Sequence, residues 1–220
     1  MLRSKDDSAE AQRHGRFFSF EGTEGSGKTT QIRELSLRLE ADGHEVVQVR
    51  EPGGTPLSER VRTLLLEPAE TPVDPWAELC LYLASRAQLV AERIRPALSR
   101  GAIVLADRFG DASVAYQGAG RELGVEKVQQ LNEWVTGGLR PDRIFLFDLD
   151  PTIGLGRAKA SRGGQLDRME SEPMAFHNRV REAYLRQALL EPDRYVVIDA
   201  SLPREDVAGR IRVEIERRLS

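Results

Sequence analysis

The sequence predicts an α/β fold in which helices flank a five-stranded parallel sheet, giving three layers. Two observations lead to this expectation. Five short apolar segments with strand character alternate with helical patterns, and such alternation favours a parallel sheet with right-handed crossovers. The 220 residues are 40% hydrophobic and 30% charged, which suits one large globular domain with a sizeable core. The expected strands are 17–21, 46–50, 102–106, 143–149 and 195–198.

Each expected strand is followed by at least one expected helix, identified by apolar side chains three or four positions apart. Gly43 ends the first helix, and Pro75 opens a long one. The segment 1–15 is polar and of mixed charge, so we expect a flexible tail before a single domain at 16–220. The expected helices are 31–41, 57–66, 75–99, 112–118, 126–135, 152–160, 172–189 and 203–219.

Composition limits the expected partners and compartment. The net charge of −3 gives no general reason to expect nucleic acid or an anionic membrane as a partner. No apolar run approaches transmembrane length and the first residues do not form a signal peptide, so we expect a cytoplasmic protein. Cys80 is the single cysteine, which rules out an internal disulfide and a cysteine-based zinc site. Because Cys80 lies in an apolar helical pattern, we expect it to be a small core residue.

The clearest functional signal is the segment 22–30, which follows the phosphate-binding pattern G-x-x-x-x-G-K-S/T. Its glycines let backbone N–H groups turn inward and bind phosphate together with the positive end of the following helix. Lys28 adds a positive charge near the β- and γ-phosphates, and the Thr29 hydroxyl is placed to ligate Mg²⁺. An ordinary strand-to-helix turn is the alternative, but the flanking strand and helix favour nucleotide binding. The predicted ATP-binding residues are Gly22, Thr23, Glu24, Gly25, Ser26, Gly27, Lys28, Thr29 and Thr30.

Charged residues also follow the second and third expected strands, at the edge where open α/β sheets bind ligands. Glu51 lies in a turn rich in Pro and Gly after the second strand. Asp107 closes a fully apolar strand, a position suited to Mg²⁺ and its waters. Arg108 stands where many hydrolytic ATPases have a glutamate that activates water, which favours transfer to another acceptor. Arg86 lies on a helix face where a core residue would be expected.

The segment 157–168 carries four basic residues against one acid. It also contains two adjacent glycines, and this composition predicts a lid that closes over polyphosphate and excludes water. A solvated loop is the alternative, and the phosphate-binding loop elsewhere in the chain favours the lid. The basic residues are Arg157, Lys159, Arg162 and Arg168, and the acid is Asp167.

A set of short blocks runs in fixed order from Phe17 to the C-terminus. They are E-G-T-E-G-S-G-K-T-T at 21–30, R-E-P-G-G-T at 50–55, L-Y-L-A-S-R-A-Q at 81–88, D-R-F at 107–109, A-Y-Q-G-A-G-R at 115–121, R-P-D at 140–142 and L-D-R at 166–168. In this set and order the sequence resembles the thymidylate kinase family. The resemblance implies a P-loop kinase fold, transfer of the γ-phosphoryl group of ATP to dTMP with Mg²⁺, and a homodimer.

The resemblance also implies roles for residues around the phosphate-binding loop. Arg62, Arg86 and Arg108 match positions that hold the phosphate and base of dTMP, and arginine binds phosphate bidentately. Tyr82 matches the aromatic residue that stacks on thymine, a position more often held by Phe. The other substrate residues match as follows: Ser113 and Gln117 read the polar edge of the base, Tyr116 lies against C2′ of the sugar, and Glu24 faces the 3′-hydroxyl. Without the family match, core packing would be the preferred explanation for both tyrosines.

Members of this family supply catalytic arginine either from the phosphate-binding loop or from the lid. Positions 23–26 contain no Arg here, and the lid is rich in it, so the chain resembles the bacterial type. The resemblance places Glu51 near the transferring phosphate and its metal. Phe109 and Ala112 depart from the commoner residues at their positions, and neither carries essential chemistry. The predicted catalytic residues are Lys28, Glu51, Arg108, Arg157 and Arg162, with Thr29 and Asp107 as metal residues.

Other functions explain fewer of these features. A kinase for another small molecule would keep the phosphate-binding loop and the lid, but gives no reason for the blocks at 81–88 and 115–121. A GTP-hydrolysing switch would need an N-K-x-D motif, which the sequence lacks. A nucleic-acid motor is disfavoured by a small single domain without a basic surface.

Overall fold

A computed structural model describes residues 15–67, 71–161 and 163–219. Within these ranges five parallel strands form one sheet in the order β2-β3-β1-β4-β5, which confirms the predicted α/β fold. The strands are β1 Arg16–Gly22, β2 Val46–Arg50, β3 Ile103–Asp107, β4 Arg143–Asp148 and β5 Tyr195–Asp199. All five predicted strands are confirmed to within one residue at each end. Of the expected tail, residues 1–14 lie outside the described residues, and Gly15 donates its backbone N–H to Leu98 O at 3.3 Å.

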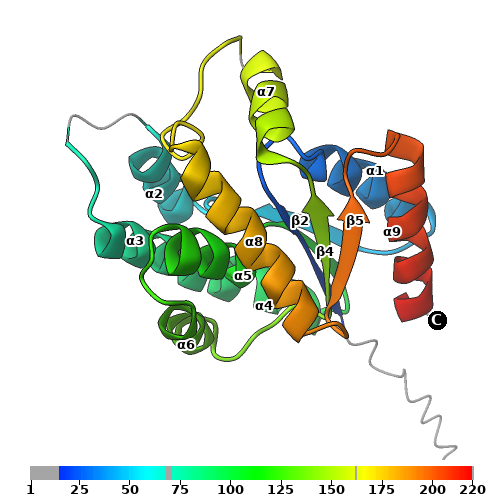
Figure 1. The fold of residues 1–220 in the computed structure, drawn as a ribbon. Helices are drawn as coiled ribbons and strands as arrows, with labels where there is room; N and C mark the ends of the chain where they lie inside the picture. The colour runs from blue at the N-terminus through cyan, green and yellow to red at the C-terminus, as the bar shows by residue number, and fades with distance from the viewer. Residues whose placement is uncertain (1–14, 68–70, 162, 220) are drawn as a thin grey trace, which may run out of the picture.

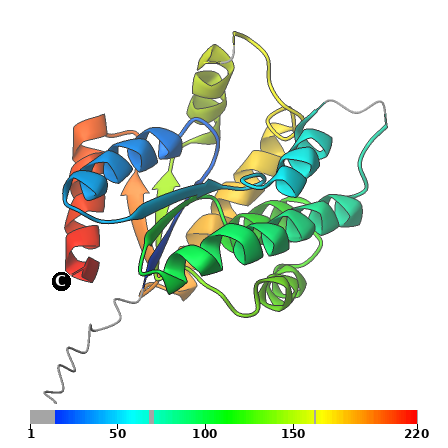
Figure 2. The same ribbon diagram turned by 180° about the vertical axis from the view of Figure 1, so that it is seen from behind.

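Helices cover both faces of the sheet (Figures 1 and 2). α1 and α9 pack on one face, while α8 and the long stretch from α3 to α4 pack on the other. The α-helices are α1 Lys28–Ala41, α2 Pro56–Leu66, α3 Pro75–Leu89, α4 Arg95–Ser99, α5 Gly110–Ser113, α6 Val125–Thr136, α7 Pro151–Ser161, α8 Met174–Leu190 and α9 Arg204–Leu219. Two π-helical segments, η1 Val90–Ile94 and η2 Val114–Gly120, interrupt this series. None of the helices in the described part of the chain combines the length and apolar character needed to cross a membrane.

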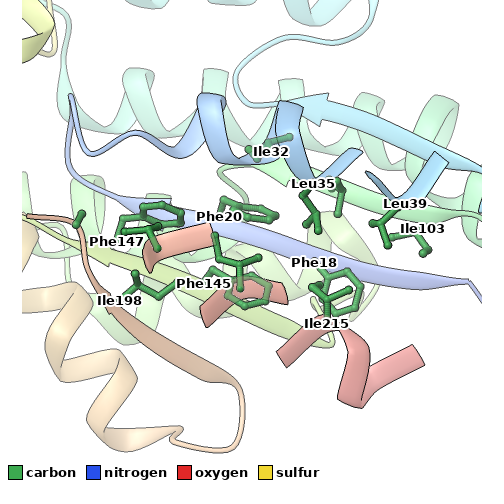
Figure 3. Packing of buried hydrophobic residues seen from close by; sticks show 14 of the residues in the cluster. Phe18, Phe20, Ile32, Leu35, Leu39, Ile103, Phe145, Phe147, Ile198 and Ile215 are labelled. Atoms are coloured by element: carbon green, nitrogen blue, oxygen red, sulfur yellow. The ribbon is translucent and has the colours of Figure 1, made fainter. Parts of the chain in front are cut away.

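The main core lies between the sheet and the helices α1 and α9 (Figure 3). Phe18 and Phe20 point to this face, whereas Phe17, one residue before Phe18, points to the opposite face, as strand geometry requires. Phe20 packs on Phe145 of β4 with ring centroids 5.1 Å apart. Because both faces of the sheet are covered, every side chain of the F-F-S-F-E run of β1 is buried.

β1 occupies the middle of the sheet, so the phosphate-binding loop that follows it lies at the centre of the carboxyl edge. α1 begins at Lys28 after Gly27, whose φ of 93° is in the left-handed region. No side chain caps this helix start. The first N–H groups of α1 are therefore available to a bound anion.

The expected helix 75–99 is continuous but changes its winding at η1. Pro96 has no N–H to donate, and in an α-helix its ring would clash with the carbonyl of Glu92. The wider turn just before Pro96 relieves that conflict. A similar widening occurs in the expected helix 112–118, where Arg121 N donates to Tyr116 O at 2.9 Å. The other predicted helices are confirmed with ends that differ by three residues or fewer.

The expectation that Cys80 is a core residue is wrong, because this side chain is exposed. Apolar residues surround α3 on nearly every side in the sequence, so periodicity alone does not define its inner face. The buried face carries Leu79 and Leu83, while Trp76 and Cys80, four residues apart, lie on the outer face. Cys80 is thus one helical position away from the core.

Two leucines on α1 test the assignment of its inner face. Leu35 is 8% exposed in the main core, whereas Leu37 is 62% exposed. We expect Leu35→Ala to lower the free energy of unfolding by about 2–4 kcal/mol through lost burial and cavity formation. The same change at Leu37 should cost less than about 0.5 kcal/mol. Urea titrations followed by circular dichroism measure both, and equal losses would contradict the packing described here.

Candidate active site

A cleft of about 520 Å³ opens at the carboxyl edge of the sheet. Its walls come from the phosphate-binding loop, the ends of β2 and β3, the helical segments α2, α3, α5, η2 and α7, and the segment 167–170. The predicted site residues that line it are Glu24, Gly25, Ser26, Gly27, Lys28, Thr29, Thr30, Glu51, Arg62, Tyr82, Asp107, Arg108, Ser113, Tyr116, Gln117 and Arg157. Gly22, Thr23 and Arg86 lie behind this surface, and Arg162 lies outside the described residues.

Lys28 is buried beneath the phosphate-binding loop. Its Nζ donates hydrogen bonds to Gly22 O at 3.0 Å, to Thr23 O at 2.7 Å and to Ser26 Oγ at 3.1 Å. Burial, together with the positive charge of Arg108, lowers the pKa of Lys28 to about 8. The ammonium group is therefore still mostly protonated at neutral pH, and its donors are engaged by three oxygen atoms of the loop.

Thr29 and Asp107 meet at the mouth of the loop, where Thr29 Oγ1 donates to Asp107 Oδ2 at 2.6 Å. Both residues offer oxygen atoms, the ligand type that Mg²⁺ prefers. In the described residues, no three His, Cys, Asp or Glu side chains gather as a metal site. A metal at this pair would therefore take further ligands from water and from the phosphates of a nucleotide, as Mg²⁺ commonly does.

The phosphate-binding loop and α7 touch through two glycines. A Cβ at Gly25 would lie 2.0 Å from Gly154 O, and a Cβ at Gly154 would lie 2.3 Å from Glu24 O. Any side chain at either position would push the two segments apart. This contact sets α7 beside the loop and brings Arg157, one turn later, to the cleft.

Arg108 contacts both the phosphate-binding loop and the segment η2. It has a positive φ of 71°, uncommon for a residue with a side chain, and its guanidinium lies over the Tyr116 ring at 4.8 Å. Arg108 Nη2 donates to Glu24 Oε1 at 2.9 Å, and Tyr116 OH donates to the same oxygen at 2.6 Å. Despite burial, Arg108 and Tyr116 hold the pKa of Glu24 below its usual range. Glu24 is therefore an ionised carboxylate that faces the cleft.

Arg86 is fully buried and supports the cleft wall from behind. Its Nε and Nη2 donate to Glu51 Oε2 at 2.8 and 2.6 Å, and Nη2 also donates to Ser113 Oγ at 3.1 Å. Nη1 donates to Asn132 Oδ1 at 2.5 Å. Glu51 lines the cleft, and its other carboxylate oxygen, Oε1, has no hydrogen-bond partner among the described residues.

The far wall of the cleft carries Arg62, Tyr82 and Gln117. Arg62 Nη1 donates to Pro52 O at 2.9 Å, which holds the guanidinium beside the turn after β2. Burial, with the nearby Glu78 carboxylate, raises the pKa of Tyr82 well above its usual range, so its hydroxyl stays neutral. An aromatic side chain and polar groups thus line the same cleft as the phosphate-binding loop.

The base of the expected lid is fixed to the body of the protein. Arg168 Nη1 lies 2.7 Å from Glu78 Oε2, and Arg168 Nε donates to Leu65 O at 2.7 Å. Arg168 does not line the cleft. Of the cations in the segment 157–168, Arg157 is the one that the described structure brings to the cleft.

A family model described as thymidylate kinase matches residues 20–211 of this sequence. The chain belongs to the thymidylate kinase family. It is 50% identical to a thymidylate kinase of Deinococcus radiodurans over 93% of this chain and 98% of that protein. It is 46% identical to a thymidylate kinase of Lactobacillus helveticus over 93% of this chain and 97% of that protein. A thymidylate kinase of Pseudomonas putida is 52% identical over 89% of this chain and 93% of that protein.

This thymidylate kinase family member contains a buried acid that the sequence analysis did not assign. Glu21 Oε1 accepts hydrogen bonds from Ser19 Oγ at 2.6 Å and Phe109 N at 2.7 Å, and Oε2 accepts from Tyr184 OH at 2.8 Å. Arg108 Nη1 in turn donates to Tyr184 OH at 3.3 Å. Glu21 thereby fixes the backbone after Arg108 and the tyrosine beneath it. A glutamate within a largely apolar strand was the signal that could have indicated this role.

The titration of Glu21 provides a test of this network. Burial, together with the Asp111 charge, raises the pKa of Glu21 from 4.5 to about 7. Between these values the folded protein binds more protons than the unfolded chain, so the stability contributed by this group falls as the pH rises. We expect the unfolding free energy of wild type, relative to Glu21→Gln, to fall by about 2 kcal/mol from pH 5 to pH 8. Urea titrations at both pH values measure it.

The matched control for that test is Glu205→Gln, which changes an exposed carboxylate on α9. Its unfolding free energy should follow that of wild type at both pH values. A Glu21→Gln variant that also follows wild type would show that Glu21 does not titrate in this window.

Proposed function

We propose that this protein transfers the γ-phosphoryl group of ATP to dTMP, giving ADP and dTDP. One observation carries the proposal: the phosphate-binding loop and a wall suited to a pyrimidine nucleotide line a single cleft. The loop lines this cleft together with Tyr82, Ser113, Tyr116 and Gln117. Cationic side chains from Lys28, Arg62, Arg108 and Arg157 stand between and around them. Membership of the thymidylate kinase family supports the same activity.

The acceptor requires little acid–base catalysis. A phosphate monoester has a second pKa of about 6, so its attacking oxygen is already ionised at neutral pH. The barrier is instead the approach of two polyanions and the charge on the transferred group. We assign the neutralisation of that charge to Lys28 and Arg108, with Arg157 and Arg162 supplied by the lid.

The remaining side chains select the acceptor. Tyr82 stacks on the base in this proposal, Arg62 holds the phosphate, and Ser113 and Gln117 meet the polar edge of the base. Tyr116 and Glu24 are hydrogen-bonded to each other, so we place them together at the deoxyribose, against C2′ and the 3′-hydroxyl. Arg86 acts through Glu51 and Ser113, because it is fully buried and its donors are engaged by these two side chains, which line the cleft.

We propose Mg²⁺ as the metal, held by Thr29 and, through water, by Asp107 or Glu51. The fit rests on the Thr29–Asp107 contact and on the unpartnered Glu51 Oε1. When bound, the ion would neutralise charge on the phosphates of ATP. Thr29 contributes a neutral oxygen and Asp107 a charged one, the mixture that suits a metal shared with phosphate.

We also propose that two copies associate as a homodimer, as the family resemblance implies. Exposed apolar side chains on α2 and α3, namely Leu57, Leu64 and Trp76, support a covered surface there. Light scattering in solution measures the subunit number.

An assay of ADP release against a panel of monophosphates tests the proposed function. With ATP and Mg²⁺ present, we expect the highest kcat/KM for dTMP among dTMP, dUMP, dCMP, dGMP and UMP. In the same assay Lys28→Ala should lose roughly 100-fold or more in kcat, since one preorganised charge on the transferring group contributes about 3–4 kcal/mol. Its circular dichroism spectrum should match wild type. Preference for a purine nucleotide would exclude the dTMP assignment, and normal turnover by Lys28→Ala would exclude the role of the loop.

The lid arginines give a second prediction for the same reaction. Arg157 is exposed on α7 and reaches the cleft, as expected of a cation that meets the transferred group when the lid closes. We expect Arg157→Ala or Arg162→Ala to lower kcat at least about tenfold with little change in dTMP affinity, because the contact forms in the transition state. Arg186→Ala, on the exposed surface of α8, is the control. If both lid variants keep the wild-type kcat, the lid supplies no catalytic charge and only covers the site.

A further inference from the structure

We propose that Glu78 fixes the orientation of the Gln117 side-chain amide, and thereby makes the site accept thymine or uracil and reject cytosine. The inference rests on the proposed function, because it takes Gln117 as the residue that reads the base. It adds a positioning residue that lies outside the cleft and touches no substrate. Glu78 would act only through the amide that it holds.

Glu78 is a fully buried carboxylate behind the base end of the cleft. Gln117, on η2, lines the cleft and is 1% exposed, and its Nε2 donates to Glu78 Oε1 at 2.9 Å. Because an ionised carboxylate can only accept hydrogen bonds, the NH₂ group of the amide must face Glu78. The amide oxygen and the second N–H of the same NH₂ group are left for the cleft.

Two arginines keep Glu78 ionised and in place. Arg121 donates to it through Nε at 3.2 Å and through Nη2 at 3.0 Å, and Arg168 Nη1 lies 2.7 Å away. Burial alone would raise the pKa of Glu78, but the hydrogen bonds from Arg121, Gln117 and Arg168 lower it below its usual range. Glu172 balances Arg121 from the other side at 2.6 Å. The carboxylate therefore stays an obligate acceptor at neutral pH.

The fixed amide distinguishes the pyrimidines by the polarity of their edges. Thymine and uracil present an N3–H donor beside the O4 acceptor, which matches an amide oxygen beside an N–H. Cytosine presents the reverse, an N3 acceptor beside the N4 amine. To bind cytosine equally well, Gln117 would have to flip and turn its oxygen toward the buried Glu78 carboxylate. Two acceptors would then face each other without a proton, which costs binding energy.

A structural role alone would predict something different. Glu78, Arg121, Arg168 and Glu172 form a charged cluster that also joins α3 to η2 and to the segment after the lid. Removing the Glu78 charge could therefore weaken the whole site. Such damage would lower activity with every nucleotide by a similar factor. The proposed role changes the preference between cytosine and thymine, and leaves the preference between uracil and thymine unchanged, because these two bases share the same edge.

The test is Glu78→Gln, assayed with dTMP, dUMP and dCMP. A glutamine at 78 can present either a donor or an acceptor, so Gln117 can adopt both orientations. We expect the ratio of kcat/KM for dCMP to that for dTMP to rise about tenfold or more. The ratio for dUMP to dTMP should stay within about twofold of wild type.

The matched control is Glu172→Gln, which removes one negative charge from the same cluster without contacting Gln117. It should leave both ratios as in wild type. If Glu78→Gln does not fold, the double variant Glu78→Gln with Arg121→Gln removes one charge of each sign and serves in its place. It should show the same rise in the dCMP ratio.

The outcomes separate this inference from the proposed function. An unchanged dCMP ratio in Glu78→Gln, or an equal rise for dCMP and dUMP, would overturn the role of Glu78 while wild-type activity on dTMP still stands. A wild type without activity on dTMP would overturn the proposed function itself. A similar rise in the dCMP ratio in Glu172→Gln would reduce the effect to charge loss and would also overturn the role of Glu78.

Discussion

The site depends on a balance of charge in a confined space. A cleft for two phosphorylated nucleotides needs several cations close together, and cations crowded in a partly buried site repel one another unless acids lie beside them. Among the described residues that line the cleft, Lys28 and four arginines face five acids. The pairing of Arg108 with Glu24 shows how this is done, since each side chain keeps the other ionised. Two further ion pairs support the wall: Arg86 lies behind it and pairs with Glu51 of the cleft, and Arg168 pairs with the buried Glu78.

The sheet determines where these charges gather. β1 is central, β3 lies on one side of it and β4 on the other, so their carboxyl ends bring the phosphate-binding loop, Asp107 and the start of α7 to one edge. The phenylalanines of β1 and β4 fix the strands beneath (Figure 3). Polar side chains thus line the carboxyl edge of an apolar sheet. The uncapped N-terminus of α1 lies at the same edge.

Local patterns predicted the strands, the helices and most residues of the cleft, because alternation, glycine positions and family blocks are all properties of neighbouring residues. They did not predict the partners of Glu21 and Glu78. Glu78 meets Gln117 and Arg168, which are distant in sequence and become neighbours only when α3, η2 and the end of the lid pack together. Cys80 was misplaced for the opposite reason: apolar residues all around α3 conceal its inner face.

The contact between Gly25 and Gly154 has a mechanical consequence for α7. The helix contacts the phosphate-binding loop closely near its first turn. If α7 tilts, the contact therefore acts as the hinge point, and displacement grows along the helix. At 1.5 Å per residue, Arg157 lies about 4–5 Å along the axis from the hinge point and Ser161 about 10 Å. A tilt of α7 would therefore carry its far end through more than twice the arc of Arg157. Arg157, which is close to the contact, would therefore move less than the C-terminal end of α7 in such a tilt.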